Sequence, residues 1–164
     1  QAGVSHYAVG DVNGPTGPVE NEDYVVALAR TAAGVPLTLE SSRAAVGDQN
    51  NYGFEVRGTT GLVRWDFRRS DELQVSTGDN YSNQPTSTVY AGPGDGEYGS
   101  FQPGAGIAIS YDDSKVMECA AFVRGILAGA VQGASIGVAV ASAVALEAIV
   151  ESAATGSWIT LAGR

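Results

Sequence analysis

The segment GDGEYG, residues 94–99, spaces its glycines as G-x-G-x-x-G, a pattern that can bind the pyrophosphate of a dinucleotide. In such sites the glycines let a strand turn tightly into a helix, so that backbone N–H groups and the helix N-terminus face the phosphates. Here SFQPGAGIA follows, and Pro103 with the glycines beside it prevents that helix from starting. Asp95 and Glu97 would also repel a phosphate. We therefore expect a surface loop and no cofactor-binding residue here.

Side chains that ligate metals or act as nucleophiles are scarce. The chain has one cysteine, Cys119, and one histidine, His6. It can form no internal disulfide and no zinc-binding cysteine cluster, and we expect no metal site. Because Cys119 lies in an apolar helical segment with no histidine near it in sequence, we expect a packed thiol rather than a nucleophile.

The charge of the chain argues against two classes of partner. It has 18 acidic and 9 basic residues, a net charge of −9, and its basic residues are scattered except for Arg68-Arg69. A phosphate backbone or an anionic membrane needs a clustered basic surface, so we expect neither nucleic acid nor membrane as a partner. The two arginines precede SDEL, whose carboxylates they can pair with at the surface.

Length and hydropathy predict one folded domain with a core. The 164 residues are 44% hydrophobic and 16% charged. The first ten residues lack the basic and apolar regions of a secretory signal, so the expected location is the cytoplasm. The apolar stretch 136–150 is interrupted by Ser142 and Glu147 and is shorter than the ~20 residues that span a bilayer. We expect it to form a buried helix.

The order of periodic segments predicts β-hairpins followed by helices. Residues 1–19 are rich in Gly, Pro and Ser, which indicates an extended lead-in to a domain at 20–164. Two hairpins and two further strands follow, with sequences EDYVVALART and VPLTLESSRA, NYGFEVRG and GLVRWDF, then DELQVST and STVYA. Alternation in the first hairpin places three side chains on one face, Leu37, Leu39 and Ser41. In the second it places four together, Phe54, Val56, Val63 and Trp65.

Capping residues mark two helices in the last third. Ser110 or Asp112 can begin the first, which should end near Gly129; Ser135 can begin the second, which should end near Gly156. SWITL, 157–161, should form a closing strand. The predicted fold class is α+β, a mainly antiparallel open sheet with helices on one face. The opposite face of that sheet must contact another body.

Four segments, in their order and spacing, resemble the C-terminal domain of the glucose-fructose oxidoreductase and inositol dehydrogenase family (Gfo/Idh/MocA). They are NEDYVVALARTAAGVPLTLESSR, FEVRGTTGLVRWDF with RRSDELQV, ISYDDSKVMECAAFVRGILAG, and ASAVALEAIVESAATGSWITL. The resemblance covers about residues 20–162 and implies the dihydrodipicolinate-reductase-like fold of that domain.

The resemblance also implies a function. Family members join this domain to an N-terminal Rossmann domain that binds NAD or NADP, pass a hydride to or from a sugar, polyol or related hydroxy compound, and form homodimers or homotetramers through the open sheet. The family's catalytic Lys in E-K-P and its Asp-to-His segment have no counterpart in this sequence, so no catalytic residue is assigned. The chain is then expected to be a fragment that lacks its Rossmann domain and has no cofactor of its own.

The substrate-side residues of the family lie at the end of the second strand and in the next loop. Here that segment is SSRAAVGDQNNYG, and a polyol needs fixed donors and acceptors. A later segment, at Tyr111-Asp112, returns toward the same cleft. The candidate substrate-binding residues are Arg43, Asp48, Asn50, Asn51 and Tyr111. The alternatives are a solvated turn for the first four and a helix cap at Asp112.

Two alternatives stay open on the sequence alone. Trp65 and Phe67 fit a core or a subunit interface better than a sugar-stacking platform. A non-enzymatic binding or interaction module could also use this fold. The exact substrate, the choice between NAD and NADP, and the oligomer size are not fixed by any of these residues.

Overall fold

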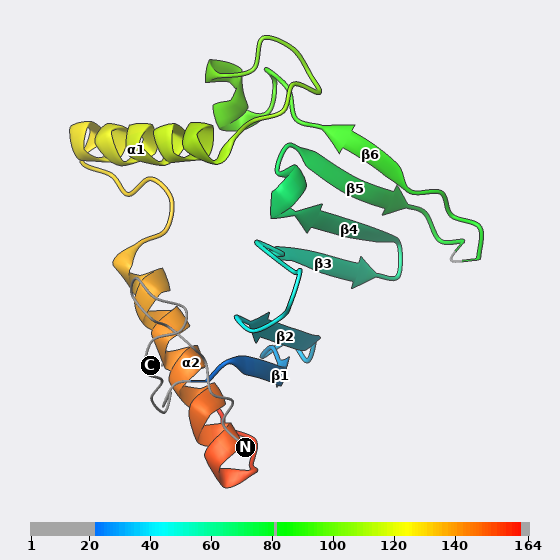
Figure 1. Ribbon diagram of the computed structural model, residues 1–164, viewed down its shortest axis with the longest axis vertical. Coiled ribbons are helices and arrows are strands. Elements are labelled where there is room, and N and C mark those ends of the chain that lie inside the picture. The colour runs from blue at the N-terminus through cyan, green and yellow to red at the C-terminus, as the bar shows by residue number, and fades with distance from the viewer. Residues whose placement is uncertain (1–21, 81, 162–164) are drawn as a thin grey trace, which may run out of the picture. The chain divides into compact units, whose positions relative to one another are not determined.

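The computed structural model describes residues 22–80 and 82–161 (Figure 1). The chain divides into two compact units, Gln1–Gln49 and Asn50–Arg164. Strands β1 and β2 belong to the first; strands β3–β6, two short 3-10 helices and helices α1 and α2 belong to the second. The predicted lead-in, 1–19, lies outside the described residues.

The first unit contains a β-hairpin. β1 (Tyr24–Arg30) pairs antiparallel with β2 (Pro36–Ser42) over the full length of both strands. The Thr31 N–H donates to the Val35 carbonyl at 2.9 Å, and Gly34 takes a φ of +84°, which glycine adopts without a steric penalty. The predicted hairpin and its turn are confirmed. Three residues of β2 lie on one face as predicted, Leu37, Leu39 and Ser41.

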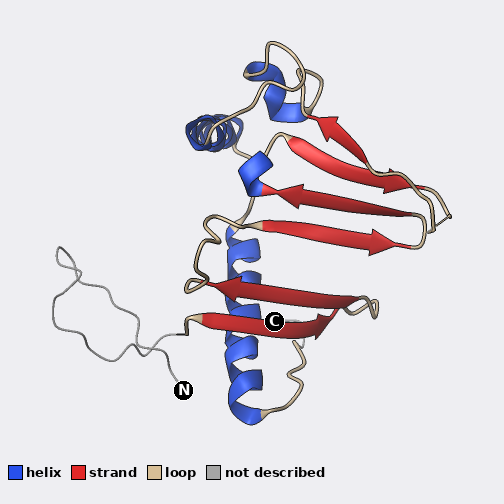
Figure 2. Ribbon diagram, turned by 45° about the vertical axis from the view of Figure 1, so that its right-hand side comes forward, coloured by secondary structure: helices blue, strands red, loops and turns tan. Residues whose placement is uncertain are grey.

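The second unit contains a four-stranded antiparallel sheet in the order β3-β4-β5-β6 (Figure 2). The strands are β3 (Gly53–Gly58), β4 (Gly61–Asp66), β5 (Glu72–Thr77) and β6 (Ser87–Tyr90). The six strands predicted before the helices are confirmed. Their hydrogen bonds form a two-stranded sheet and a four-stranded sheet, whereas a single sheet was predicted. Gly53 is required where it lies, because a Cβ there would meet the Trp65 carbonyl oxygen at 2.3 Å.

The register gives the four-stranded sheet one apolar face. Phe54 pairs with Trp65, Val56 with Val63, and the same face continues across β5 and β6. We call this set the apolar face: Phe54, Val56, Val63, Trp65, Leu73, Val75 and Val89. On the opposite face, Glu55 lies directly across from Arg64 and forms ion pairs with Arg64 and Arg57.

Both predicted helices form between the predicted caps. α1 (Tyr111–Ala128) begins at Ser110, whose hydroxyl accepts from the Asp113 N–H at 3.3 Å while the Asp113 carboxylate accepts from the Ser110 N–H at 2.8 Å. It ends at Gly129, which has a φ of +61°. Ser110 is therefore the cap, and Asp112 is not.

α2 (Ile136–Thr155) begins at Ser135 and ends at Gly156, again as predicted. The segment after it was predicted to be a closing strand, but residues 157–161 form no strand. A strand needs an edge to pair with, and both sheets pair only their own strands among the residues described.

The prediction of a hydrophobic core is wrong for this chain by itself. Among the described residues no hydrophobic side chain is buried, and neither helix contains a buried residue. α2 was predicted to be buried, but most of its residues are exposed, and Ile136 is 83% exposed. The helix is also longer than the apolar stretch 136–150, and by length and composition it could cross a membrane. Cys119 on α1 is also exposed rather than packed. Periodicity identifies an apolar helix but not the surface that covers it.

A short 3-10 helix, Gly96–Ser100, begins within the glycine-rich segment 94–99. The next α-helix begins only at Tyr111, so the strand-to-helix turn of a dinucleotide site is not formed. The Asp95 carboxylate accepts from the Gly92 N–H at 2.9 Å, and Glu97 pairs with Arg124 at 2.5 Å. These carboxylates stabilise the loop itself.

Candidate functional site

Five aromatic rings gather at one end of the four-stranded sheet. They come from the residue just before β3, from β3 and β4, from the 3-10 helix Phe67–Arg69 that follows β4, and from the first turn of α1: Tyr52, Phe54, Trp65, Phe67 and Tyr111. Their nearest centroids are 5.5–6.4 Å apart, and all but the Phe54–Trp65 pair meet edge to face. This is the preferred geometry of aromatic contacts. We call this group the aromatic cluster.

Trp65 lies at the centre of the cluster and is fixed by a hydrogen bond. Its indole Nε1 donates to the Ser70 carbonyl at 2.9 Å, and the Tyr98 hydroxyl donates to the same carbonyl at 3.2 Å. Partial burial, with the neighbouring Asp71 carboxylate adding a smaller effect, raises the pKa of Tyr98 above its usual value.

The backbone holds Tyr52 and Asn50 beside the cluster. The Tyr52 N–H donates to the Asn50 carbonyl at 2.9 Å, and the Phe67 N–H donates to the Tyr52 carbonyl at 2.8 Å. Asn50 has a φ of +51°, in the left-handed region that asparagine tolerates better than most residues. Backbone hydrogen bonds thus join the turn at Asn50 to Tyr52, and Tyr52 to Phe67.

The structure joins three of the five candidate residues in one unit. Asn50, Asn51 and Tyr111 belong to the second unit, where Tyr111 contacts Phe67 with centroids 6.4 Å apart. The remaining candidates belong to the first unit. There, the Arg43 Nε donates to the Asp23 carboxylate at 2.7 Å, and the Asp48 N–H donates to the Ala45 carbonyl at 3.4 Å.

Sequence reasoning did not select Tyr52. It precedes Phe54 by two residues, so strand alternation already placed both on one side, but a tyrosine in a turn carries no other signal. Lys115 was also not selected, and its ammonium lies 5.3 Å from the centroid of the Tyr111 ring, a cation–π contact. Lys115 also donates to Glu118 at 2.7 Å.

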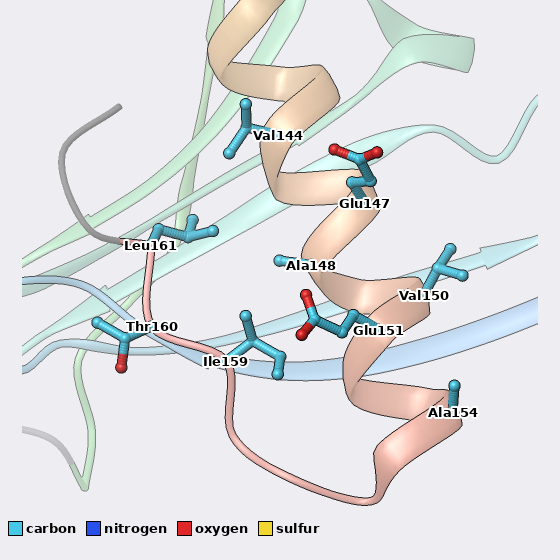
Figure 3. A pocket seen from close by; sticks show the side chains of 9 residues that line it. All are labelled: Val144, Glu147, Ala148, Val150, Glu151, Ala154, Ile159, Thr160 and Leu161. Atoms are coloured by element: carbon cyan, nitrogen blue, oxygen red, sulfur yellow. The ribbon is translucent and has the colours of Figure 1, made fainter.

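A hollow of about 440 Å³ lies elsewhere, between the C-terminal half of α2 and the segment that follows it (Figure 3). Its lining is apolar except for Thr160 and the carboxylates of Glu147 and Glu151. It contains no lysine, arginine or histidine, so no group in it can bind a phosphate or donate a proton from a cation. None of the candidate residues lines this hollow.

A smaller hollow of about 200 Å³ lies beside the charged face of the four-stranded sheet. Its lining consists of Arg64, Trp65, Asp66, Arg69, Glu72 and Gln74. Arg69 pairs with Glu72 at 2.9 Å, as its position before SDEL predicted, and Arg68 pairs with Asp66 at 2.8 Å. Over residues 22–80 and 82–161, no group of three or more His, Cys, Asp or Glu side chains is arranged to hold a metal ion.

Comparison with known proteins identifies relatives of this chain. No protein-family model matches it. Levoglucosan dehydrogenase of Pseudarthrobacter phenanthrenivorans is 35% identical over 147 residues, which are 89% of this chain and 38% of that protein. The chain is homologous to levoglucosan dehydrogenase.

The homology extends to the fold. The structure of levoglucosan dehydrogenase in complex with NADH and L-sorbose superimposes with a TM-score of 0.83 at 34% identity, over 89% of this chain and 39% of that one. An NAD binding oxidoreductase from Klebsiella pneumoniae gives a TM-score of 0.80 at 29% identity, over 90% and 40% of the two chains. The predicted α+β class is confirmed. The chain spans less than half the length of levoglucosan dehydrogenase.

Proposed function

We propose that this chain is the C-terminal, substrate-binding and oligomerisation domain of an NAD(P)-dependent oxidoreductase of the Gfo/Idh/MocA family. The substrate class is a sugar, a polyol or a related hydroxy compound. One observation carries the proposal: 89% of the chain shares sequence and fold with levoglucosan dehydrogenase, whose structures hold NADH with levoglucosan or L-sorbose. We call the complete protein, with its cofactor domain, the parent protein.

The cofactor belongs to the rest of the parent protein. Relatives bind NADH, which favours NAD over NADP. The described residues of this chain do not fit it, because the only G-x-G-x-x-G segment forms a 3-10 turn with carboxylates at Asp95 and Glu97. We therefore assign to this chain the binding and orientation of the substrate, and to the missing Rossmann domain the hydride transfer.

Substrate binding in this proposal uses polar groups on the loop between β2 and β3. In the second unit, the side-chain amides of Asn50 and Asn51 supply donors and acceptors for hydroxyls, and Tyr111 adds a hydroxyl and a ring. Arg43 and Asp48, in the first unit, are proposed separately as a donor and an acceptor. A sugar with several hydroxyls needs such a mixed set to fix its orientation for hydride transfer.

The exposed apolar surface supports the oligomerisation role. Phe54 and Val56, at the edge of the apolar face, are 52% and 60% exposed, and no hydrophobic residue described is buried. The chain is 44% hydrophobic, so its exposed apolar side chains need other protein surfaces to cover them. In this proposal those surfaces are the cofactor domain and further copies of the protein in a homodimer or homotetramer. The net charge of −9 argues against nucleic acid and anionic membrane as that surface, and we propose a cytoplasmic protein.

The test begins with the gene that encodes this chain. The parent protein is purified and mixed with NAD or NADP and a panel of levoglucosan, L-sorbose and myo-inositol, and the formation of reduced cofactor is followed by its absorbance. Oxidation of at least one of these compounds is the expected result. A gene that encodes no nucleotide-binding domain, or a parent protein that binds no NADH, would overturn the proposal in favour of a non-enzymatic binding module.

A further inference from the structure

We propose that the rings of Tyr52 and Tyr111, with Phe67 between them, form a stacking surface for the carbohydrate ring of the substrate. This inference rests on the proposed function, because it assumes that the parent protein acts on a sugar. It adds Tyr52 and Phe67 to the substrate side and gives Tyr111 a specific role.

Tyr52 and Tyr111 are exposed side chains that both contact Phe67. Tyr52 is 65% exposed and Tyr111 is 61% exposed, although both contact Phe67, with centroids 5.7 and 6.4 Å apart. Both contacts are edge to face, with interplanar angles of 62° and 85°. The two tyrosines are therefore held in place by Phe67 while most of each side chain remains open to a ligand.

The backbone at both tyrosines is fixed by hydrogen bonds or by a helix. The Tyr52 backbone is bonded on both sides, through its N–H to Asn50 and through its carbonyl to the Phe67 N–H. Tyr111 is the first residue of α1, directly after the capping box of Ser110 and Asp113. An aromatic side chain on such a frame loses little conformational entropy when a ligand stacks on it.

The polar groups beside the rings indicate the class of ligand. A pyranose or furanose presents C–H groups on one face and hydroxyls around its edge, so it needs a ring to stack on and donors and acceptors beside that ring. Lys115, a donor, lies next to Tyr111 and is bonded to the acceptor Glu118, and Asn50 lies next to Tyr52. A phosphorylated ligand is disfavoured, because Lys115 is already paired with Glu118 at 2.7 Å.

The competing role for these rings is packing against another polypeptide segment, and leucine substitutions separate the two. Leucine keeps an apolar side chain for packing but removes the flat ring that stacks on a sugar. The variants are Tyr52→Leu and Tyr111→Leu in the parent protein. Phe122→Leu is the matched control, since Phe122 lies on the same helix as Tyr111, is 68% exposed and is not in the aromatic cluster.

The measurement compares KM for the sugar with KM for the cofactor in each variant. Each tyrosine variant should raise KM for the sugar about two- to tenfold, with KM for NAD unchanged, and Phe122→Leu should change neither. Tyr111→Phe, which keeps the ring, should retain most of the sugar affinity. An unchanged KM for the sugar in both leucine variants, or a rise confined to KM for NAD, would overturn the proposal.

Failure of the proposed function is recognised separately. If the parent protein oxidises no sugar, calorimetric titration with levoglucosan and L-sorbose tests the stacking surface directly in the parent protein and in Tyr111→Leu. If the parent protein binds a sugar and Tyr111→Leu weakens that binding, the stacking surface is supported even though the proposed enzymatic activity has failed. Absence of binding, or equal binding by both proteins, would contradict it.

Discussion

Phe54 and Trp65 lie directly opposite each other on β3 and β4, with ring centroids 5.9 Å apart and planes inclined by 29°. This stacked pair joins the apolar face to the aromatic cluster, and the Trp65 indole is tied to the Ser70 carbonyl. Trp65 in turn contacts the rings of Tyr52 and Phe67 in the candidate site.

Replacing Trp65 should therefore loosen the sheet locally. Trp65→Ala should lower the free energy of opening of β3 and β4 by about 2 kcal/mol, less than for a fully buried aromatic, because the side chain is only half-buried. Trp65→Phe should cost about 1 kcal/mol for the lost hydrogen bond to Ser70. Hydrogen exchange of the β3 and β4 amides in the parent protein measures both values. Unchanged exchange in Trp65→Ala would show that the pair does not hold the strands.

The N-terminal cap of α1 makes a second prediction. Ser110→Ala removes the hydroxyl that accepts from the Asp113 N–H and should cost about 1 kcal/mol. The effect should appear as faster exchange of the amides in the first turn of α1. Ser142→Ala, within α2, is the control and should leave α1 unchanged. Equal exchange in wild type and Ser110→Ala would mean that contacts in the parent protein fix Tyr111 instead of the cap.

The ion pairs of Glu55 predict a pH dependence. The hydrogen bond from Arg64, with a smaller contribution from Arg57, lowers the pKa of Glu55 below its usual value. A carboxylate with a lowered folded-state pKa stabilises the fold above its unfolded pKa and loses that contribution as the pH falls through the folded pKa. In the parent protein, Glu55→Gln should thus reduce the midpoint of thermal unfolding at neutral pH, and the difference from wild type should shrink between about pH 5 and pH 3.

The control for Glu55 is Glu151→Gln, because Glu151 on α2 has no ion-pair partner among the residues that the structure describes. Its difference from wild type should stay small at neutral pH. A Glu55→Gln difference that remained constant down to acidic pH would contradict the assignment. Added salt should also reduce the effect, because these side chains are solvent-accessible.

The absence of a buried hydrophobic core predicts the behaviour of the isolated chain. Residues 1–164 on their own should bind a hydrophobic dye and unfold without a cooperative transition, whereas the parent protein should unfold cooperatively. The measurement is dye fluorescence and thermal unfolding on both proteins. If the isolated chain unfolded cooperatively and bound no dye, its helices and strands would have to cover one another without the rest of the parent protein.

Local signals in the sequence were sufficient for the six strands, the two helices and the pairing within each of the two predicted hairpins. Alternation around the turn between β3 and β4 placed Phe54 with Trp65 and Val56 with Val63, and Ser135 and Gly156 marked both ends of α2. These features depend on residues close in sequence, so they could be predicted without knowledge of the rest of the protein.

Features that depend on distant surfaces could not be predicted. Cys119 on α1 and the apolar helix α2 are both left exposed by the described part of the chain. Residues 157–161 have no strand edge to pair with among the described residues. The contact of Tyr111 with Phe67 joins residues 44 positions apart, which no periodicity reveals. Tyr52 was missed because a tyrosine in a turn carries no signal of its ring contacts with Trp65 and Phe67.

The central claim is that this chain forms the sugar side of a sugar oxidoreductase whose cofactor side lies elsewhere in the parent protein. Titration with NADH, followed by an assay for sugar-dependent reduction of NAD, on both the parent protein and the 164-residue chain tests it most directly. We predict that the parent protein binds NADH and oxidises a sugar, and that the chain alone does neither. NADH binding by the chain alone, or a parent protein inactive on every sugar and polyol tested, would contradict the claim.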